Sequence, residues 1–410
     1  MSFDKVEIWV HDHLLKNEKL RHGLYGLYQR GMYLLRRPKK CVGQVRCLSP
    51  NDGREYFFGY YDKTPLDSQG KRALMLGVSS STKAADSTEE ADILLVDIGT
   101  GEAKKIAVTH SWNVQQGCML QWLDDDRVLY NDFRNNAYVS VIMTLSDKKE
   151  RILDCPVYAL SADKTFALTL DFSRLHRLRP GYGYANLPEA TEGQLCPDAV
   201  CIHELDLSSG AITPVMKYTD LAMISPRPEM EGAEHKVNHL MISPDGKRFM
   251  VLHRWFQKGV KYTRLVTANI DGSEPYVLAD DDFVSHCCWK GNDQIISYMN
   301  KNPGGKGYYQ LTDRTDKCER LWPSLAMDGH PTCSPDGQYV VTDTYPDRTR
   351  IQTVYVMKGD KVKTAVKVFS PFKYGGDVRC DLHPRWVQGN RICFDGTFEG
   401  KRRLYITEIP

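Results

Sequence analysis

Short hairpins that share one turn sequence recur along this chain, and they restrict its fold more than any other feature. The clearest copies read ALSADKTFALTLD at 159–171, MISPDGKRFMVLHRW at 241–255 and PTCSPDGQYVVTDTY at 331–345. The Asp-Gly step of the last two suits a tight turn, because Gly accepts φ > 0 without a steric penalty. A second hairpin follows most copies, for example at 91–108 and 262–278. Four short strands per repeat are typical of a β-propeller blade.

The repeats divide the chain into seven units, at 45–110, 111–154, 155–220, 235–281, 282–325, 326–374 and 375–410. The last unit is one strand short. The segment VGQVRCLS at 42–49 can supply that strand and close the ring, which would remove the exposed sheet edges. We therefore predict an all-β fold: a seven-bladed β-propeller over 42–410, preceded by a short N-terminal helical extension over 1–41. Six and eight blades are the alternative counts.

The extension has a helical pattern and a basic character. Between residues 14 and 40, apolar residues recur at helical spacing, and Lys and Arg greatly outnumber the single Glu18. Three glycines interrupt the pattern and weaken the prediction of one continuous helix. Two interpretations stay open. The favoured one is a helix packed on the outside of the propeller; the other is a helix that contacts a membrane surface or a partner protein through residues 14–40.

Composition excludes several classes of protein. The net charge of +2 gives no reason to expect a nucleic-acid partner. The twelve cysteines form no CxxC pair, which argues against a structural zinc site of that type. No secretory signal and no apolar run of transmembrane length is present, so we expect a cytoplasmic protein, with a peripheral membrane contact as the extension's alternative role.

Polar residues gather where a propeller would place its central channel. The first strand of each blade lines that channel, so ionisable residues just before the hairpin turns are site candidates. These positions hold Tyr60, Tyr61, Asp62 and Lys63, then Asn113, Gln115 and Gln116, then His235, Asn238 and His239, then His286, then Asp328 and His330, and finally Arg379, Asp381, His383 and Arg385. Blade three instead has an Arg-rich insertion, SRLHRLRPGYGY, which contains Arg174, Arg177, Arg179 and Tyr182.

Two chemistries suit these residue types. Neutral imidazoles of His286, His330 and His383 can ligate a divalent metal ion. Channel arginines can bind carboxylates in a bidentate manner. A cation beside a carboxylate stabilises the enolate that forms when a His or Tyr removes the α proton. Such chemistry cleaves uronic-acid polysaccharides by β-elimination.

The sequence resembles the oligogalacturonate lyases, seven-bladed propellers that cleave short uronides with a manganese ion. The resemblance is best over 235–410, through NHLMISPDGKRFMVLHRW, SHCCW, DGHPTCSPDGQYVVTD and RCDLHPRWVQGNRICFDGTFEGKRRLYITEI. It implies that His286 and His383 are metal ligands, that His239 lies near the catalytic His position, and that Arg177 or Arg179 approximates the catalytic Arg. The family's last-blade motif Gln-x-x-His-x-His reads Cys380, His383 and Arg385 here, so a metal site would need His330 or a carboxylate such as Asp381.

These observations define three sets of candidate residues. The catalytic candidates are His239, Arg177, Arg179, Tyr61 and Arg254; the substrate-binding candidates are Arg174, Tyr182, Gln115, Gln116, Arg379 and Arg385; the metal candidates are His286, His330 and His383. The predicted activity is that of a lyase acting on an acidic, uronate-containing oligosaccharide, with a divalent metal, manganese by resemblance.

The alternative function is a non-catalytic propeller that binds a glycan or assembles with other proteins. In that case the channel histidines would pair with partners such as Asp343 and Tyr345 and leave no open cation site. Propellers with S-P-D-G blades also accompany proteases, but no G-x-S-x-G motif of a serine hydrolase occurs here.

Overall fold

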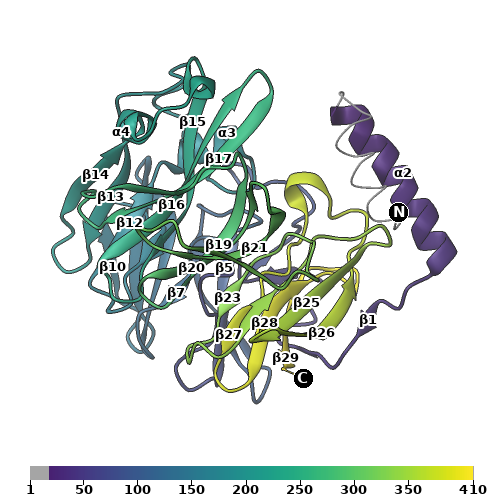
Figure 1. The fold of residues 1–410 in the computed structure, drawn as a ribbon. Coiled ribbons are helices and arrows are strands. Elements are labelled where there is room, and N and C mark those ends of the chain that lie inside the picture. Colours follow the sequence, from purple (N-terminus) through teal and green to yellow (C-terminus); the bar gives the residue numbers. More distant parts are fainter. Residues whose placement is uncertain (1–17, 410) are drawn as a thin grey trace.

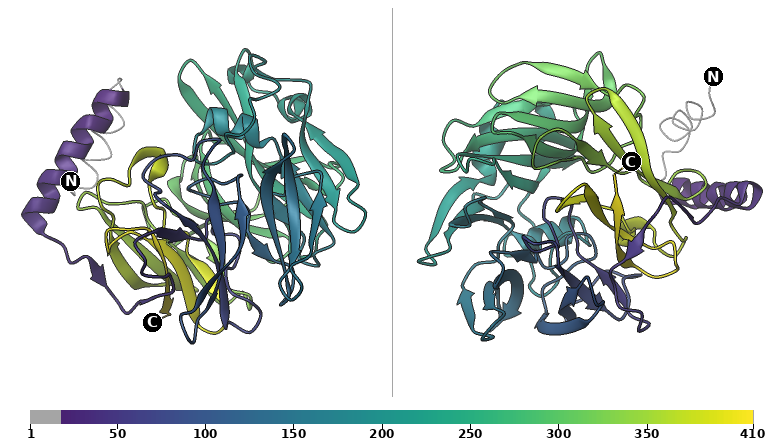
Figure 2. Two further views of the ribbon diagram at one scale, coloured as in Figure 1. Left: turned by 180° about the vertical axis from the view of Figure 1, so that it is seen from behind. Right: turned by 90° about the horizontal axis from the view of Figure 1, so that it is seen from below.

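Seven antiparallel sheets stand side by side around a central channel (Figures 1 and 2). The structure is a computed structural model that describes residues 18–409. The predicted seven-bladed β-propeller is confirmed, and each predicted unit corresponds to one sheet. One hydrophobic cluster joins blades three to five, with members such as Leu168, Val251 and Ile295, and a second joins blades one, two and seven.

The first three blades follow one another along the chain, each with four strands. Blade one contains β3 (Glu55–Phe57), β4 (Arg72–Val78), β5 (Ala91–Asp97) and β6 (Ala103–Thr109). Blade two contains β7 (Gln121–Trp122), β8 (Arg127–Arg134), β9 (Ala137–Thr144) and β10 (Glu150–Leu153). Blade three contains β11 (Ala159–Leu160), β12 (Phe166–Leu170), β13 (Val200–Asp206) and β14 (Ile212–Lys217).

The next two blades have longer strands. Blade four contains β15 (Glu234–Ile242), β16 (Arg248–Gln257), β17 (Val260–Asn269) and β18 (Tyr276–Ala279). Blade five contains β19 (Val284–Lys290), β20 (Gln294–Lys301), β21 (Gly305–Thr312) and β22 (Cys318–Leu321).

The N-terminal segment completes the last two blades. Blade six contains β23 (Thr332–Cys333), β24 (Val340–Thr342), β25 (Ile351–Lys358) and β26 (Lys361–Phe369), and β1 (Cys41–Val42) pairs with β26 as a fifth strand. Blade seven contains β27 (Arg385–Val387), β28 (Arg391–Gly396) and β29 (Arg403–Glu408), and β2 (Arg46–Cys47) is its outermost strand. The prediction that 42–49 completes the last blade is therefore confirmed, because β2 joins a segment near the start of the chain to one at its end.

The repeated turns have the conformation that their sequence predicts. Gly246 and Gly337 have φ values of +72° and +68°, which L-residues rarely adopt. In the less regular third copy Lys164 stands at the glycine position with φ +63°. The Ser243 hydroxyl donates to Oδ1 of Asp245 at 2.7 Å, and the same oxygen accepts from the Lys247 backbone N–H at 3.2 Å. These bonds hold the turn and orient the strand before it toward the channel.

Short helices interrupt the strands. The insertion of blade three contains α3 (Phe172–Leu178), and α4 (Tyr218–Met223) and η1 (Pro228–Met230) lie between blades three and four. The turn η2 (Gly376–Val378) precedes β27. Asp171 caps α3 by accepting a hydrogen bond from the Arg174 backbone N–H at 3.0 Å. This cap fixes the direction of the Arg-rich insertion.

The helical extension contains α2 (Glu18–Arg36), a single helix despite its glycines. The part of the predicted extension before residue 18 lies outside the described residues. Within residues 18–409 no helix combines the length and the apolar character that crossing a bilayer requires.

Candidate active site

Four histidines from four neighbouring blades meet in the channel. His239 belongs to β15 and His286 to β19, while His330 and His383 directly precede β23 and β27. Ring centroids are 5.1 Å apart for His239–His286, 4.1 Å for His286–His330 and 4.4 Å for His330–His383. Each side chain is at most 2% exposed. The predicted convergence of the histidines is what the structure shows.

Two of these histidines have an unusual backbone. His239 and His383 have φ values of +55° and +45°, in the left-handed region that non-glycine residues seldom occupy. Such conformations persist only when the surrounding structure enforces them, and they cluster at functional sites. At His239 the ladder between β15 and β16 is interrupted after Asn238, which turns the imidazole toward the channel.

Tyr60 and Tyr61 follow β3 and reach the centre of the cluster. The Tyr60 hydroxyl and Nε2 of His239 form a short hydrogen bond. The Tyr61 hydroxyl instead donates to the Cys287 carbonyl oxygen at 2.9 Å, although its ring lies 5.2 Å from that of His330. The side chain that can exchange a proton with His239 is therefore Tyr60, and the selection of Tyr61 as the catalytic tyrosine is not supported by this contact.

Carboxylates orient two of the histidines. Oδ1 of Asp343 accepts hydrogen bonds from the backbone N–H and from Nδ1 of His330, both at 2.8 Å. Oδ2 of Asp343 accepts from the backbone N–H groups of Leu382 and His383, both at 3.1 Å. Asp328 contacts Nδ1 of His286 at 3.1 Å and accepts from the Ser285 hydroxyl at 2.5 Å. The expected Asp343–His330 pairing is present, and it ties blade six to blade seven.

Burial and charge set the protonation of the cluster. Burial, reinforced by neighbouring cationic groups, lowers the pKa values of His239, His286 and His383 well below the ordinary value, so these imidazoles are neutral at pH 7. Burial also acts to lower the pKa of His330, but the Asp343 carboxylate outweighs it and the pKa is raised. Burial raises the pKa of Asp328 to about 6.

A divalent cation fits one group of side chains in the cluster. Nε2 of His330 and Nε2 of His383 are buried and have no hydrogen-bond partner among the described residues. These two residues and Asp381 can bring one ligand atom each within 4.8 Å of one another. Two imidazoles and a carboxylate suit a divalent transition metal. His286 is not part of this group, whose third member is Asp381.

Asp381 is also bound by an arginine. Nε and Nη2 of Arg379 donate to its two carboxylate oxygens at 2.5 and 2.9 Å. Burial acts to raise the pKa of Asp381, but the Arg379 charge and these bonds keep it below its usual value. The carboxylate is therefore ionised, as a metal ligand must be, and Arg379 orients it from behind.

Cys380 and Arg385, the two positions that differ from the last-blade motif Gln-x-x-His-x-His, do not supply metal ligands. Arg385 forms an ion pair with Asp395 at 2.7 Å, and its Nε donates to the Tyr60 carbonyl oxygen at 2.9 Å. Its guanidinium therefore holds the loop before Tyr60 and is not free for the substrate, contrary to the prediction for Arg385. Burial raises the pKa of the Cys380 thiol to about 12, which keeps it protonated.

Three guanidinium groups surround the histidine cluster on one side. Arg179 lies 3.9 Å above the Tyr182 ring and Arg379 lies 4.2 Å above the Tyr345 ring. Arg254 is only 3% exposed. Burial and then the charge of Arg179 lower the pKa of Arg254 to about 10. No carboxylate within residues 18–409 forms an ion pair with Arg179 or Arg254.

The other two predicted arginines of blade three lie outside the cluster. Arg174 is fully buried in an ion pair with Glu189, and its Nε donates to the His235 carbonyl oxygen at 2.8 Å. Arg177 bridges Glu189 and Glu234. Both side chains hold the insertion against blade four. The structure therefore assigns Arg174 a structural role instead of substrate binding, and of the two candidates Arg177 and Arg179 only Arg179 faces the cluster.

Gln115 and Gln116 support the site from behind. Nε2 of Gln115 donates to the carbonyl oxygens of Asp377 at 3.0 Å and Arg379 at 2.8 Å. Nε2 of Gln116 donates to the Tyr158 hydroxyl at 2.9 Å, and this hydroxyl accepts from the His239 backbone N–H at 3.2 Å. The sequence did not indicate Tyr158 as a site residue. His239 and His330 each stand four positions before the Ser of their hairpin turn, whereas Tyr158 stands three positions before the Ser of its own turn.

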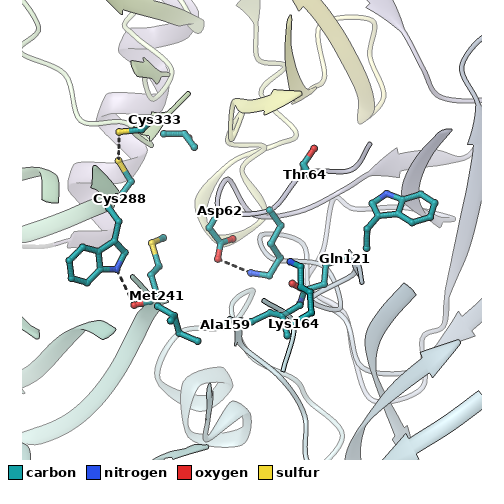
Figure 3. A pocket seen from close by; sticks show the side chains of 14 residues that line it. Asp62, Thr64, Gln121, Ala159, Lys164, Met241, Cys288 and Cys333 are labelled. Carbon is teal, nitrogen blue, oxygen red and sulfur yellow. Dashed lines mark hydrogen bonds and ion pairs between the residues drawn. The ribbon is translucent and has the colours of Figure 1, made fainter. Parts of the chain in front are cut away.

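The opposite end of the channel is a cavity of about 340 Å³ (Figure 3). Its lining follows the cluster residues along each inner strand: Asp62 comes after Tyr61, Met241 after His239 and Cys288 after His286. Cys288 and Cys333 face each other there with their sulfur atoms 3.8 Å apart. The histidine cluster therefore adjoins this cavity along the inner strands.

Known structures share this fold. An oligogalacturonate lyase from Vibrio parahaemolyticus has a TM-score of 0.62 at 15% identity, with 90% of this chain and 94% of that chain covered. An oligogalacturonate lyase in complex with manganese has a TM-score of 0.64 at 17% identity, with 90% and 93% covered. At this identity the likeness establishes the fold. No protein-family model matches the sequence, and no curated protein is significantly similar to it.

Proposed function

We propose that this propeller binds a carboxylate-bearing, uronate-containing oligosaccharide beside Arg179, Arg254 and Arg379 and cleaves it by β-elimination. One observation carries the proposal: Arg254 is buried next to Arg179, and neither guanidinium has a carboxylate partner among residues 18–409. Buried charges are normally paired, so an anionic ligand would complete this site. The two structurally similar lyases support the same class of substrate.

The Tyr60–His239 pair would act as the base. As placed, Nδ2 of Asn238 donates to Nδ1 of His239 at 2.8 Å, while Oδ1 of Asn238 is buried without a partner. Rotation of this amide by half a turn would let Oδ1 accept Nδ1–H and leave Nε2 free to accept a proton. Tyr60 would then take the proton α to the substrate carboxylate as it passes its own hydroxyl proton to Nε2.

Elimination follows from that transfer. The electron pair of the broken C–H bond forms a carbon–carbon double bond, the C–O bond β to the carboxylate breaks, and the departing sugar oxygen receives the proton that the Tyr60–His239 pair had taken up. Arg254 and Arg179 stabilise the negative charge that develops on the carboxylate during this step. Because this charge is greater in the transition state than in the bound substrate, the two guanidinium groups would stabilise the transition state more strongly.

A divalent metal ion would be held by His330, His383 and Asp381. When bound, such an ion would act as a Lewis acid toward the substrate carboxylate. Arg379 would keep Asp381 ionised and oriented, and Asp343 would present Nε2 of His330 by holding its Nδ1–H.

An absorbance assay with acidic oligosaccharides tests the proposal. Elimination produces a conjugated unsaturated uronate that absorbs in the far ultraviolet, whereas binding alone produces no new absorbance. Tyr60→Phe should lower the rate by about 10²–10⁴-fold, the usual contribution of a general base. Tyr61→Phe is the matched control, because its hydroxyl contacts only a backbone carbonyl and amide, and it should stay within a few-fold of wild type.

The binding-module alternative predicts a different result. Oligosaccharide binding with no new absorbance under any metal condition would assign the channel to recognition alone. Equal loss of activity in the two tyrosine variants would remove the proposed role of Tyr60.

A further inference from the structure

One face of the helix α2 packs on the propeller. Nε2 of Gln29 donates to the Asp347 carbonyl oxygen at 2.8 Å, and the Tyr33 ring stacks on Phe369 at a centroid distance of 4.7 Å. Both contacts are to blade six. Figure 2 shows the helix standing at the rim of the propeller, with most of its length beyond the sheets. One face of α2 is therefore anchored to blade six, whereas Leu27, Leu34 and Leu35 on the other side are exposed.

The other side of α2 carries leucines. Leu27, Leu34 and Leu35 are 64%, 67% and 79% exposed. At about 100° per residue, Leu27 and Leu34 lie on the side of α2 opposite to Gln29 and Tyr33. Exposure of these leucine side chains to water is energetically unfavourable. Because the three lie on one helix face, they form a contiguous apolar stripe. The stripe points away from the propeller, so blade six cannot cover it.

Basic residues border the leucine stripe. Arg30 is exposed on α2, and Arg36, Arg37, Lys39 and Lys40 are all exposed where the helix ends. Residues 16–40 contain eight Lys and Arg residues and one Glu, a net charge of +7, whereas the whole chain has a net charge of +2. The remainder of the chain is therefore net negative, and this basic segment is set apart from it.

We propose that α2 binds the surface of a bilayer that contains anionic lipids, with the Leu27–Leu34–Leu35 stripe in the outer acyl region and the basic residues on the lipid phosphates. An exposed apolar stripe beside a cluster of Lys and Arg is the pattern of an interfacial helix. Nucleic acid would match the charges but would leave the leucines in water.

The end of α2 suits this orientation. Arg37 has a φ of +41°, and its backbone N–H donates to the Tyr33 carbonyl oxygen at 2.8 Å, which terminates the helix. The chain then turns into β1 at Cys41. The basic residues of this turn are thus held at the junction between the helix and the propeller. A helix lying in the interface would keep the propeller directly above the membrane surface.

Vesicle flotation of the full chain tests this inference. Wild-type protein should float with phosphatidylcholine vesicles that contain phosphatidylglycerol and remain unbound with phosphatidylcholine alone. A Leu34→Ser, Leu35→Ser variant and an Arg36→Gln, Arg37→Gln variant should each bind the anionic vesicles at least about tenfold more weakly. High salt should release the wild-type protein, because the attraction to the phosphates is screened.

Matched controls separate binding from folding. Ile212 and Met223 are 44% and 73% exposed on blade three and α4, so an Ile212→Ser, Met223→Ser variant removes exposed apolar surface elsewhere and should float like wild type. All variants should unfold at the wild-type temperature. Equal binding to neutral and anionic vesicles, or no binding to either, would overturn the proposal. A dimer in light scattering that the leucine variant dissociates, without vesicle binding, would overturn it in favour of self-association.

Discussion

The hydroxyl of Tyr60 and Nε2 of His239 share a short hydrogen bond although the two residues are 179 positions apart. Tyr60 comes from blade one and His239 from blade four, so the bond crosses the channel. A propeller makes this possible because its inner strands converge on one axis. Both side chains are buried, and burial together with neighbouring cationic groups lowers the pKa of His239 well below its ordinary value.

Replacement of Arg254 should affect stability and binding in opposite directions. Arg254→Met removes a buried cation that has no carboxylate partner, so the free protein should gain about 1–2 kcal/mol in unfolding free energy. The same variant should bind uronate oligosaccharides about tenfold to a hundredfold more weakly, because a charge-assisted contact is lost. Urea denaturation and calorimetric titration measure the two effects. A variant that is destabilised and binds normally would show that Arg254 has an internal partner.

The Asp343 carboxylate should be essential for the junction of blades six and seven. It accepts four hydrogen bonds, and the amide nitrogen of Asp343→Asn would face N–H donors that an oxygen now serves. We expect a loss of about 3 kcal/mol in the free energy of unfolding, measured in urea. Asp328→Asn is the control: the pKa of about 6 means that this carboxyl tolerates protonation, so the loss should stay below about 1 kcal/mol.

A second histidine pair makes stability depend on pH. Nε of Arg264 donates to Nδ1 of His253 at 3.2 Å, so His253 must carry its proton on Nε2 and donate it to Nδ1 of His235 at 2.8 Å. Burial lowers the pKa of His253 well below 6.5. The unfolded chain therefore binds a proton that the folded chain does not, and stability falls as pH drops below about 6.5.

The size of this effect can be isolated with one variant. Each histidine that stays neutral to pH 5 costs about 2 kcal/mol of unfolding free energy between pH 7 and pH 5. His253→Gln can keep both hydrogen bonds without a titrating group, so its stability should fall by about 2 kcal/mol less than that of wild type over this range. His330 does not obscure the result. Its pKa is raised in the folded protein, so the free energy by which its protonation stabilises the fold is fully present below pH 6.5. Parallel pH dependences would contradict the assignment.

Metal binding should depend on Asp381 and not on His286. Protein purified without chelator should hold a divalent ion in elemental analysis, and added manganese should raise the unfolding temperature. Asp381→Asn and His383→Asn should abolish both effects. His286→Gln should retain them, because Nδ1 of His286 contacts Asp328 and the side chain lies outside the donor group. Loss of the metal in the His286 variant alone would favour the ligand set that the sequence resemblance implies.

The sequence predicted the architecture because propeller blades are local. Each turn, such as that of Gly246, is specified by four or five adjacent residues. Because the turn recurs along the chain, each copy adds to the sequence evidence for a propeller. The strand that closes the ring was predictable for a related reason: the last blade lacked one strand, and an unassigned strand remained near the start of the chain. These inferences need no knowledge of distant contacts.

The site was predictable only as a list of residues. Inner-strand register placed His239, His286, His330 and His383 together, but register cannot show which atoms meet. Tyr60 and not Tyr61 forms a hydrogen bond with His239, since adjacent residues of an irregular segment point in different directions. Arg174 was misassigned because its partner, Glu189, lies in the same insertion, where no repeat defines the geometry.

The masses of the reaction products show directly whether the protein cleaves a uronate oligosaccharide by β-elimination. Incubation of the protein with a defined uronate oligosaccharide, followed by mass spectrometry, distinguishes elimination from hydrolysis and from binding. We expect two fragments whose masses add up to that of the substrate, one of them unsaturated, and their absence with Tyr60→Phe. Fragments that together exceed the substrate by one water, or an intact substrate bound to the protein, would contradict β-elimination at the Tyr60–His239 pair.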